Sequence, residues 1–273
     1  MEFSSDLILL AMVLLLAGAL TGVLAGLFGV GGGALMVPVL YETFGFLGVD
    51  DAARMPLAVG TSLAVIIPTS LKSYRSHLAR GAVDTELLRR WAVPIVAGVL
   101  LGAVIARYAS PVVMQAVFVL VAGINAVKLI SGTKRWDIAN DLPGGWLLRA
   151  YGWVIGLLSS LMGIGGGQIA NIIMTLHGRA IHQAVATSAG IGVLISIPGA
   201  LGYVFAGWGR TDLPPDAIGF VSLLGVVLFV PTTVMTASLG VRLAHSLSQR
   251  RLELAFGVFL ALVSLRFIFA MLG

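Results

Sequence analysis

The chain has 273 residues, of which 58% are hydrophobic and only 11% are charged, and its mean hydropathy is +1.02. Soluble domains are about half apolar and about a quarter charged, so this composition excludes a soluble enzyme and a disordered chain. The absence of cysteine excludes a disulfide scaffold and thiolate or zinc–thiolate chemistry. A polytopic membrane protein remains, and its net charge of +5 indicates basic cytoplasmic loops rather than nucleic-acid binding.

Ten apolar runs, separated by polar or glycine-rich breaks, predict membrane helices, because unpaired backbone groups cannot face lipid and the alternation of a barrel is absent. The acidic start of the chain and the first run, which continues past Phe28, indicate a retained helix rather than a secretory signal. One run, 167–176, would extend only about 15 Å, half of a membrane core, and predicts a re-entrant or broken helix. The runs are 7–28, 33–48, 56–71, 91–106, 111–130, 146–162, 167–176, 183–207, 217–241 and 254–272.

The chain contains an internal repeat at an offset near 134 residues. The run Gly-Val-Gly-Gly-Gly at 29–33 matches Gly-Ile-Gly-Gly-Gly at 163–167, and Ala-Val-Gly-Thr-Ser at 58–62 matches Ala-Val-Ala-Thr-Ser at 184–188. These matches, which keep their order, predict two homologous halves of about five membrane segments each. We expect a first membrane repeat at 1–131, a cytoplasmic linker at 132–145 and a second membrane repeat at 146–273.

The charges of equivalent loops predict that the two halves are inverted. Loop 72–90 carries five Lys and Arg residues, whereas its counterpart 208–216 has one Arg and two Asp. In the next pair of loops the order is reversed, because 107–111 has one Arg and 242–251 has three. Because Lys and Arg favour the cytoplasm, equivalent loops face opposite sides, as in many secondary transporters. The predicted fold is therefore an all-α polytopic membrane protein with two inverted-topology repeats, comprising about eight full crossings plus short broken or re-entrant glycine-rich helices.

One topology is consistent with every loop. The N-terminus, 41–55, 107–111, 208–216 and the C-terminus face outside. The loops 72–90, 131–149, 177–182 and 242–251 face inside, and the inside then holds 13 of the 17 Lys and Arg residues when Lys128, at the end of its helix, is included.

The two glycine runs are the strongest indication of a binding site. Glycine costs a helix about 1 kcal/mol relative to alanine, so each run favours a break. A break leaves backbone N–H groups at the start of the next helix, where anions bind. Inversion would bring both starts to one anion cavity, although close helix packing is the alternative interpretation. The predicted residues are Gly31, Gly32, Gly33, Gly165, Gly166 and Gly167.

Polar side chains near the glycine runs are further candidates. The repeated pairs Thr61-Ser62 and Thr187-Ser188 offer hydroxyl donors, although bonds to helix carbonyls would serve equally. Gln168 and Asn171, which have no polar counterpart in the first half, would either face the substrate or bond within the protein. The sequence shows no cluster of His, Asp and Glu at one membrane depth, so we expect no enzyme activity, catalytic residue, metal or cofactor.

The pattern Leu-Phe-Gly-Val-Gly-Gly-Gly at 27–33, its repeat at 163–167 and the Ala-Thr-Ser at 186–188 resemble the TauE/SafE family of sulfite exporters. The resemblance covers nearly the whole chain. It implies a bacterial inner-membrane permease for small anions, chiefly sulfite and organosulfonates, in which 31–33 and 165–167 are the motif glycines.

These observations predict a secondary transporter that moves small anions of the sulfite or organosulfonate class by alternating access, with both termini periplasmic. Export is favoured and uptake stays open. The expected partners are an anion such as sulfite or sulfoacetate, the lipid bilayer, and a proton or sodium as coupling ion; no nucleic acid is expected. The alternatives are an anion channel, a permease for another small organic acid, and a non-transporting scaffold that would tolerate alanine at the glycine motifs.

Overall fold

Ten helices and one short hairpin make up the part of the chain that the structure describes. This computed structural model describes residues 12–23, 33–132, 139, 141–246 and 248–272. The elements are a helix at Met12–Val23, α2 (Gly33–Phe46), α3 (Asp51–Ala79), α4 (Thr85–Tyr108), α5 (Pro111–Ser131), α6 (Gly145–Met162), α7 (Gly167–Leu176), α8 (Ile181–Ala206), β1 (Ala217–Ile218), β2 (Val221–Ser222), α9 (Leu223–Ser246) and α10 (Gln249–Leu272).

Five of these helices are long and apolar enough to cross a membrane, so the chain is a polytopic membrane protein. They are the helical segments Asp51–Ala79, Thr85–Tyr108, Pro111–Ser131, His182–Ala206 and Glu253–Met271. Shorter apolar helices lie at Met12–Val23, Gly33–Phe46, Gly167–Leu176 and Leu223–Thr236. Five candidate spans and four shorter apolar helices are thus present among the described residues, and the number of about eight full crossings stays a prediction.

Capping residues set where the long helices begin and end. The Asp50 side chain accepts a hydrogen bond from the Ala52 N–H at 2.8 Å at the start of α3, and Asp84 accepts one from the Leu87 N–H at 2.9 Å at the start of α4. An aspartate at this position satisfies a free N–H group and complements the helix dipole. α5 ends at Gly132, whose φ of 64° is the left-handed conformation that ends many helices.

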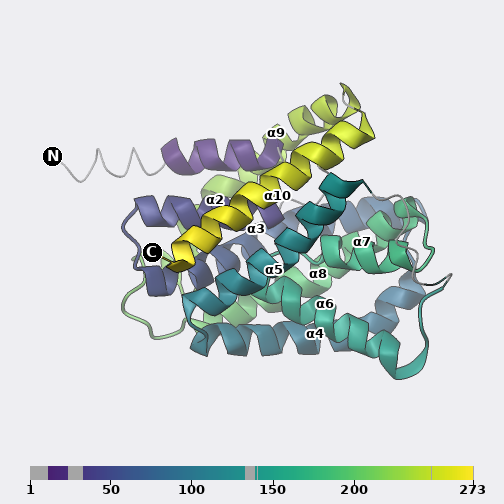
Figure 1. The fold of residues 1–273 in the computed structure, drawn as a ribbon. Helices are drawn as coiled ribbons and strands as arrows, with labels where there is room; N and C mark the ends of the chain where they lie inside the picture. The colour runs from purple at the N-terminus through teal and green to yellow at the C-terminus, as the bar shows by residue number, and fades with distance from the viewer. Residues whose placement is uncertain (1–11, 24–32, 133–138, 140, 247, 273) are drawn as a thin grey trace.

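The connections between helices lie at two opposite ends of the molecule (Figure 1). The α2–α3, α4–α5 and α8–α9 connections lie at the left end, together with the last residues of α10. The α3–α4, α5–α6, α7–α8 and α9–α10 connections lie at the right end. We call the right end the basic end, because its described basic residues include Arg75, Arg80, Arg89, Arg90, Arg149, Arg179, Arg250 and Arg251.

The short helix α7 returns to the end from which its predecessor came. α6 enters from the basic end, the chain turns at residues 163–166, and α7 runs back toward the basic end (Figure 1). With 10 residues α7 spans about 15 Å. The break predicted before 167–176 is therefore present, and α2 occupies the opposite half of the molecule (Figure 1).

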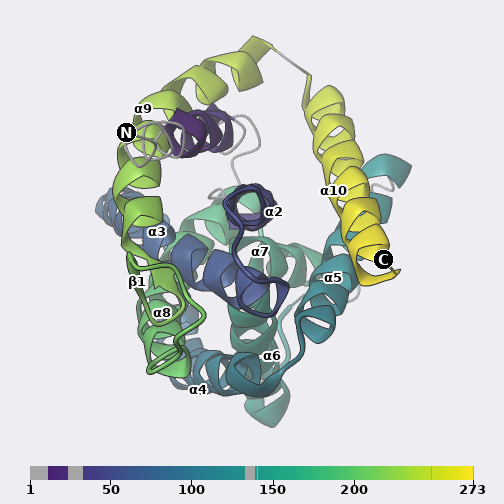
Figure 2. The same ribbon diagram turned by 90° about the vertical axis from the view of Figure 1, so that its left-hand side faces the viewer.

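The long helices α3 and α8 pack along each other at the centre of the bundle, whereas α5 and α10 lie side by side at one edge (Figure 2). Where α3 and α8 meet, the hydroxyl oxygens of Ser70 and Ser196 are 3.4 Å apart. Their separation of 126 residues equals the separation of the matched Thr-Ser pairs at 61–62 and 187–188. Equivalent residues of the sequence repeat thus contact each other at this crossing.

Glycines let α4 and α6 approach until their backbones touch. A Cβ added at Gly98 would lie 2.2 Å from the Trp153 carbonyl oxygen, and one at Gly156 would lie 2.1 Å from the Ile95 carbonyl oxygen. Each glycine belongs to a pair four residues apart, Gly98 with Gly102 and Gly152 with Gly156. Such pairs are a common way for membrane helices to pack closely.

The helix at Met12–Val23 packs against α9 in a similar way. Its Gly18 faces the Thr232 side chain, and its Gly22 faces Thr236, whose hydroxyl donates to the Ala19 carbonyl at 2.9 Å. Gly18 and Gly22 precede Gly152 and Gly156 by 134 residues. The first helix of each predicted half therefore contacts the fourth helix of the other half through glycines at matching positions.

The segment 217–222 corrects one prediction, because its apolar residues form a hairpin rather than the start of a helix. Gly219 turns the chain with a φ of 54° between β1 and β2, and α9 begins only at Leu223. The Asp216 carboxylate accepts hydrogen bonds from the Ser222 hydroxyl at 2.6 Å and the Leu224 N–H at 3.2 Å. This aspartate holds the chain in a turn, which delays the helix.

In the loop that precedes β1, the only arginine, Arg210, forms an ion pair with Asp212. The Arg210 guanidinium donates to the Asp212 carboxylate at 2.9 Å through Nε, and this hydrogen bond holds the pKa of Asp212 below its usual range. The left end therefore carries little net positive charge at this loop.

Candidate functional site

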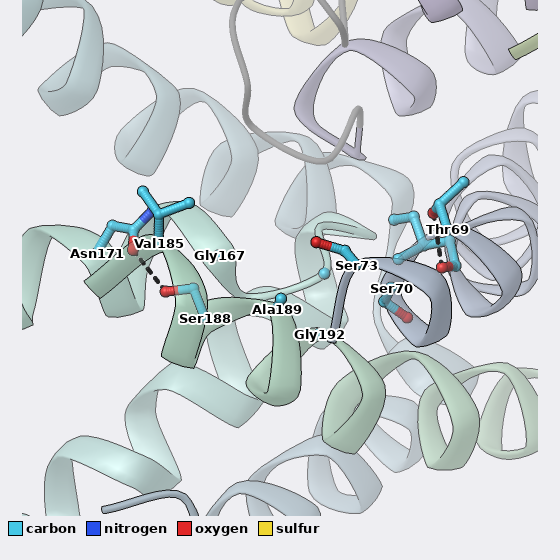
Figure 3. Close-up of a pocket in the computed structure, with 11 residues that line it drawn as sticks. Thr69, Ser70, Ser73, Gly167, Asn171, Val185, Ser188, Ala189 and Gly192 are labelled. Carbon is cyan, nitrogen blue, oxygen red and sulfur yellow. Dashed lines mark hydrogen bonds between the residues drawn. The ribbon is translucent and has the colours of Figure 1, made fainter. Parts of the chain in front are cut away.

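A small cavity lies among α3, α7 and α8 (Figure 3). Its volume is about 110 Å³, enough for several water molecules or one small oxyanion. The residues that line it are Ile66, Thr69, Ser70, Ser73, Gly165, Gly167, Asn171, Val185, Ser188, Ala189 and Gly192.

The second glycine run forms the turn that brings the start of α7 to this cavity. Gly163 and Gly166 have φ values of 64° and 70°, which side chains with a Cβ rarely adopt. The first backbone bond of α7 runs from the Ala170 N–H to the Gly166 carbonyl at 3.1 Å. The N–H groups of residues 167–169 come before this bond, as at any helix start, and carry the positive end of the helix dipole.

One helical turn after Gly167, Asn171 presents its side chain to the cavity (Figure 3). The Ser188 hydroxyl donates to Asn171 Oδ1 at 2.6 Å. This bond orients the amide so that Nδ2 is left to donate, and no described residue accepts a hydrogen bond from it. Val37 takes the matching place in the first half, so only the second half supplies a polar group here.

The hydroxyls of α3 form the opposite wall and were missed by the sequence analysis. Thr69 and Ser70 donate to the carbonyls of Ile66 and Ile67 at 2.8 and 3.1 Å, so their oxygens are turned toward their own helix. No described residue hydrogen-bonds to the Ser73 hydroxyl. The sequence feature that could have indicated this wall is the group of hydroxyl residues that follows Pro68. A proline inside a helix removes one backbone hydrogen bond at that point.

Of the predicted site residues, four line this cavity: Gly165, Gly167, Asn171 and Ser188. Gly31 and Gly32 lie outside the described residues. Gln168 follows Gly167 directly in the sequence and is buried, but it does not line the cavity. Gly166 packs against Ile195, whose Cδ1 would be only 2.1 Å from an added Cβ.

Three predicted hydroxyls instead hold the two halves together. Thr61 accepts a hydrogen bond from the Ser222 N–H, and Thr187 accepts one from the Asp84 N–H, both at 3.0 Å. These two bonds are matched, because each reaches the residue that precedes the fourth helix of the other half. Ser62 donates to the Gly163 carbonyl at 2.8 Å. These three hydroxyls therefore bond to backbone groups, which was the alternative to binding the substrate.

The start of α2 approaches the second glycine turn, but α2 does not contribute to the described lining of the cavity. A Cβ added at Gly33 would be 2.9 Å from the Ile164 Cα, so the start of α2 touches the second glycine turn. Beside it, the Val37 side chain fills the space next to Gly163. The sequence predicted a cavity shared by both runs, whereas the described lining comes from α3, α7, α8 and the second run.

The lining itself is uncharged, and charge gathers beyond it at the basic end. Lys72 and Arg75 flank Ser73 along α3, and His182 is exposed in the first turn of α8. Arg179 pairs with Asp141 across 3.4 Å. A basic surface of this kind would concentrate anions at this end of the molecule. The described residues contain no group of three or more His, Asp and Glu that could hold a metal ion.

The comparisons with known proteins agree with a transporter. Residues 14–267 match the family model described as sulfite exporter TauE/SafE. A probable membrane transporter protein of Haemophilus influenzae is 30% identical over 92% of this chain and 95% of its own length. One of Methanocaldococcus jannaschii is 27% identical over 95% of this chain and 96% of its own length, and one of Bacillus subtilis is 23% identical over 94% and 97%. None of the solved structures matches this chain. With nearly its whole length matched, the chain belongs to the TauE/SafE family of membrane transporters.

Proposed function

We propose that this protein is a secondary transporter that moves small anions of the sulfite or organosulfonate class across the bacterial inner membrane. The observation that carries the proposal is the cavity at the start of α7, which offers neutral donors in a space of about 110 Å³. Sulfite is a small oxyanion whose oxygens accept hydrogen bonds from backbone N–H groups, amides and hydroxyls. Neutral donors hold an anion without a fixed counter-charge, which favours its release.

The two halves, 1–131 and 146–273, are inverted-topology repeats joined by the cytoplasmic linker 132–145. The matched bonds of Thr61 and Thr187 and the matched glycines of the helix at Met12–Val23 and of α6 support this arrangement. In such transporters the substrate binds near the midplane and the halves rock to expose it alternately.

In the proposed arrangement the binding site is open at one side of the molecule and closed at the other, and the repeat supports this. Positions that line the cavity in the second half, Asn171, Val185 and Ala189, match Val37, Val59 and Leu63, all of which are fully buried. Apolar packing therefore occupies the site that is equivalent to the cavity. This arrangement is the one expected when the binding site is open toward the basic end and sealed toward the other end.

The basic end faces the cytoplasm in this proposal, because Lys and Arg favour the cytoplasmic side of a membrane. The cavity is then open to the cytoplasm, and both termini are periplasmic. An anion gathered from the cytoplasm would be released outside, which corresponds to export. A proton or sodium ion is the expected coupling ion.

Transport by the purified protein in liposomes tests the proposal. Labelled sulfite should enter proteoliposomes faster than protein-free liposomes, and excess unlabelled sulfite or methanesulfonate should slow this uptake. Imposed proton and sodium gradients, applied one at a time, identify the coupling ion by which of them accelerates uptake. Correctly folded protein that carries neither anion would contradict the proposal.

The remaining alternatives give different results in the same preparation. A channel would produce single-channel currents in a planar bilayer, at rates too fast for a carrier. A permease for another small organic acid would show uptake of labelled carboxylates that sulfite does not inhibit.

A further inference from the structure

We propose that the cavity selects singly charged oxyanions, so that the transported form of sulfite is the hydrogen sulfite monoanion and dianions such as sulfate are excluded. This inference rests on the proposed function and concerns the same site. It follows from the charge of the lining, from the number of donors that are left unused, and from the energy of moving a charge out of water.

The lining carries no counter-charge for a bound anion. Its polar side chains are Thr69, Ser70, Ser73, Asn171 and Ser188, and the other residues that line it are glycines and aliphatic side chains. A buried charge is costly unless it is paired or fully hydrogen-bonded. Any anion in this cavity is therefore held by dipoles alone.

Few of those dipoles are free to act as donors. Thr69 and Ser70 already donate to carbonyls of α3, and Ser188 donates to Asn171 Oδ1. The unused donors are the Asn171 amide, the Ser73 hydroxyl and the N–H groups at the start of α7, represented in the lining by Gly167. These are the donors that the lining offers to the oxygens of an SO₃ group.

The energy of dehydration decides between the two protonation states. The favourable hydration free energy of an ion grows with the square of its charge. When it leaves water, a dianion therefore loses about four times as much hydration free energy as a monoanion of the same size. The same neutral donors cannot compensate for this difference, because their attraction to the ion grows only in proportion to its charge. A sulfonate or hydrogen sulfite is therefore favoured over sulfite dianion or sulfate.

Titratable groups close to the cavity do not belong to its lining, but a test that varies pH must control for them. They lie on each element that packs around it: Lys72 and Arg75 on α3, His177 at the end of α7, and His182 at the start of α8. His177 Nδ1 is 2.7 Å from the Ile173 carbonyl oxygen and its ring packs edge-on against Tyr151. Methanesulfonate, which keeps one charge throughout, measured under the same conditions controls for any effect of these residues.

Exchange of labelled for unlabelled anion, with equal pH on both sides of the proteoliposome membrane, measures the selectivity without a proton gradient. At a fixed subsaturating concentration of total sulfite, the rate should fall about tenfold as the pH rises from about 6 to about 8, because sulfite loses its second proton in this range. Methanesulfonate, a monoanion throughout, should change less than about twofold. Sulfate should not be exchanged, and the flux in protein-free liposomes is subtracted at each pH.

Each outcome separates this inference from the proposed function. Exchange of both anions with a sulfite rate that stays constant or rises with pH would overturn monoanion selection while leaving the transporter intact. No exchange of either anion at any pH would instead reject the proposed function.

A cation placed at the cavity provides the complementary test. Val185→Lys would add an ammonium group to the lining one turn after α8 begins, so it should make sulfite exchange at about pH 8 approach the rate at about pH 6. Val185→Met, which adds length without charge, is the matched control and should keep the wild-type pH dependence. An unchanged pH dependence in folded Val185→Lys protein would contradict the account.

Discussion

Replacing Gly167 by leucine should abolish anion transport while leaving the protein folded. A Cβ at this position would meet only the Ser188 Cβ, at 3.9 Å, which is ordinary contact, so the first carbon fits. The remaining carbons of leucine would extend into the cavity that Gly167 lines. Overfilling a packed space by this much costs about 3 kcal/mol of binding, which corresponds to a loss of about a hundredfold in uptake of labelled sulfite.

Gly167→Ala is the matched control, because its methyl group makes the same first contact and leaves most of the cavity empty. We expect transport within a few-fold of wild type and an unchanged melting temperature. Wild-type uptake by Gly167→Leu protein that elutes as a folded species would show that the anion does not pass through this cavity.

Replacing Gly156 by leucine should strongly destabilise the protein. The Cβ would lie 2.1 Å from the Ile95 carbonyl oxygen and 3.0 Å from the Ile95 Cα, and both belong to the backbone of α4. A helix backbone cannot move aside as a flexible side chain can, so α6 would be forced away from α4. We expect a loss of about 3 kcal/mol or more, seen as a melting temperature lower by roughly 10 °C in detergent.

Gly123 on α5 supplies the control for this prediction. Nothing lies within 4 Å of a Cβ added there, so leucine at 123 should leave the melting temperature within a few degrees of wild type. Equal melting temperatures for Gly156→Leu and Gly123→Leu would contradict the close approach of α4 and α6.

The helices were predictable because membrane composition leaves few choices. Each apolar run contains one helix in the part that the structure describes, and the run too short to cross, 167–176, matches the bounds of α7. The hairpin at 217–222 was missed because its residues are as apolar as those of α9. Only Asp216 and Gly219 mark the turn, and their hydrogen bonds and backbone conformation cannot be read from hydropathy.

The site was only partly predictable, because the repeat does not show by itself which half contributes to a cavity. The sequence shows that Asn171 is polar where the first half has Val37, but only the structure shows that the cavity forms where Asn171 lies. The sequence cannot distinguish the hydroxyls of Thr61 and Thr187 from the hydroxyls that line the cavity. Their backbone partners, at the starts of α9 and α4, are more than a hundred residues away in sequence.

The wall formed by α3 escaped notice for a simpler reason. Ser and Thr are common in membrane helices, where they bond to the carbonyl of the preceding turn. Thr69 and Ser70 do so, and only the packing of α8 against α3 turns this stretch into one side of a cavity.

Chemical labelling of a cysteine placed in the cavity tests the central claim most directly. The native chain has no cysteine, so Ala189→Cys would add a single thiol to the lining, and Ser76→Cys would add one at the exposed basic end. The reagent is a small, membrane-impermeant anionic thiosulfonate, applied to vesicles that expose the cytoplasmic face. Methanesulfonate in excess should slow the reaction at residue 189 about tenfold or more and leave the reaction at residue 76 unchanged. Equal rates at residue 189 with and without methanesulfonate would show that no anion occupies this cavity.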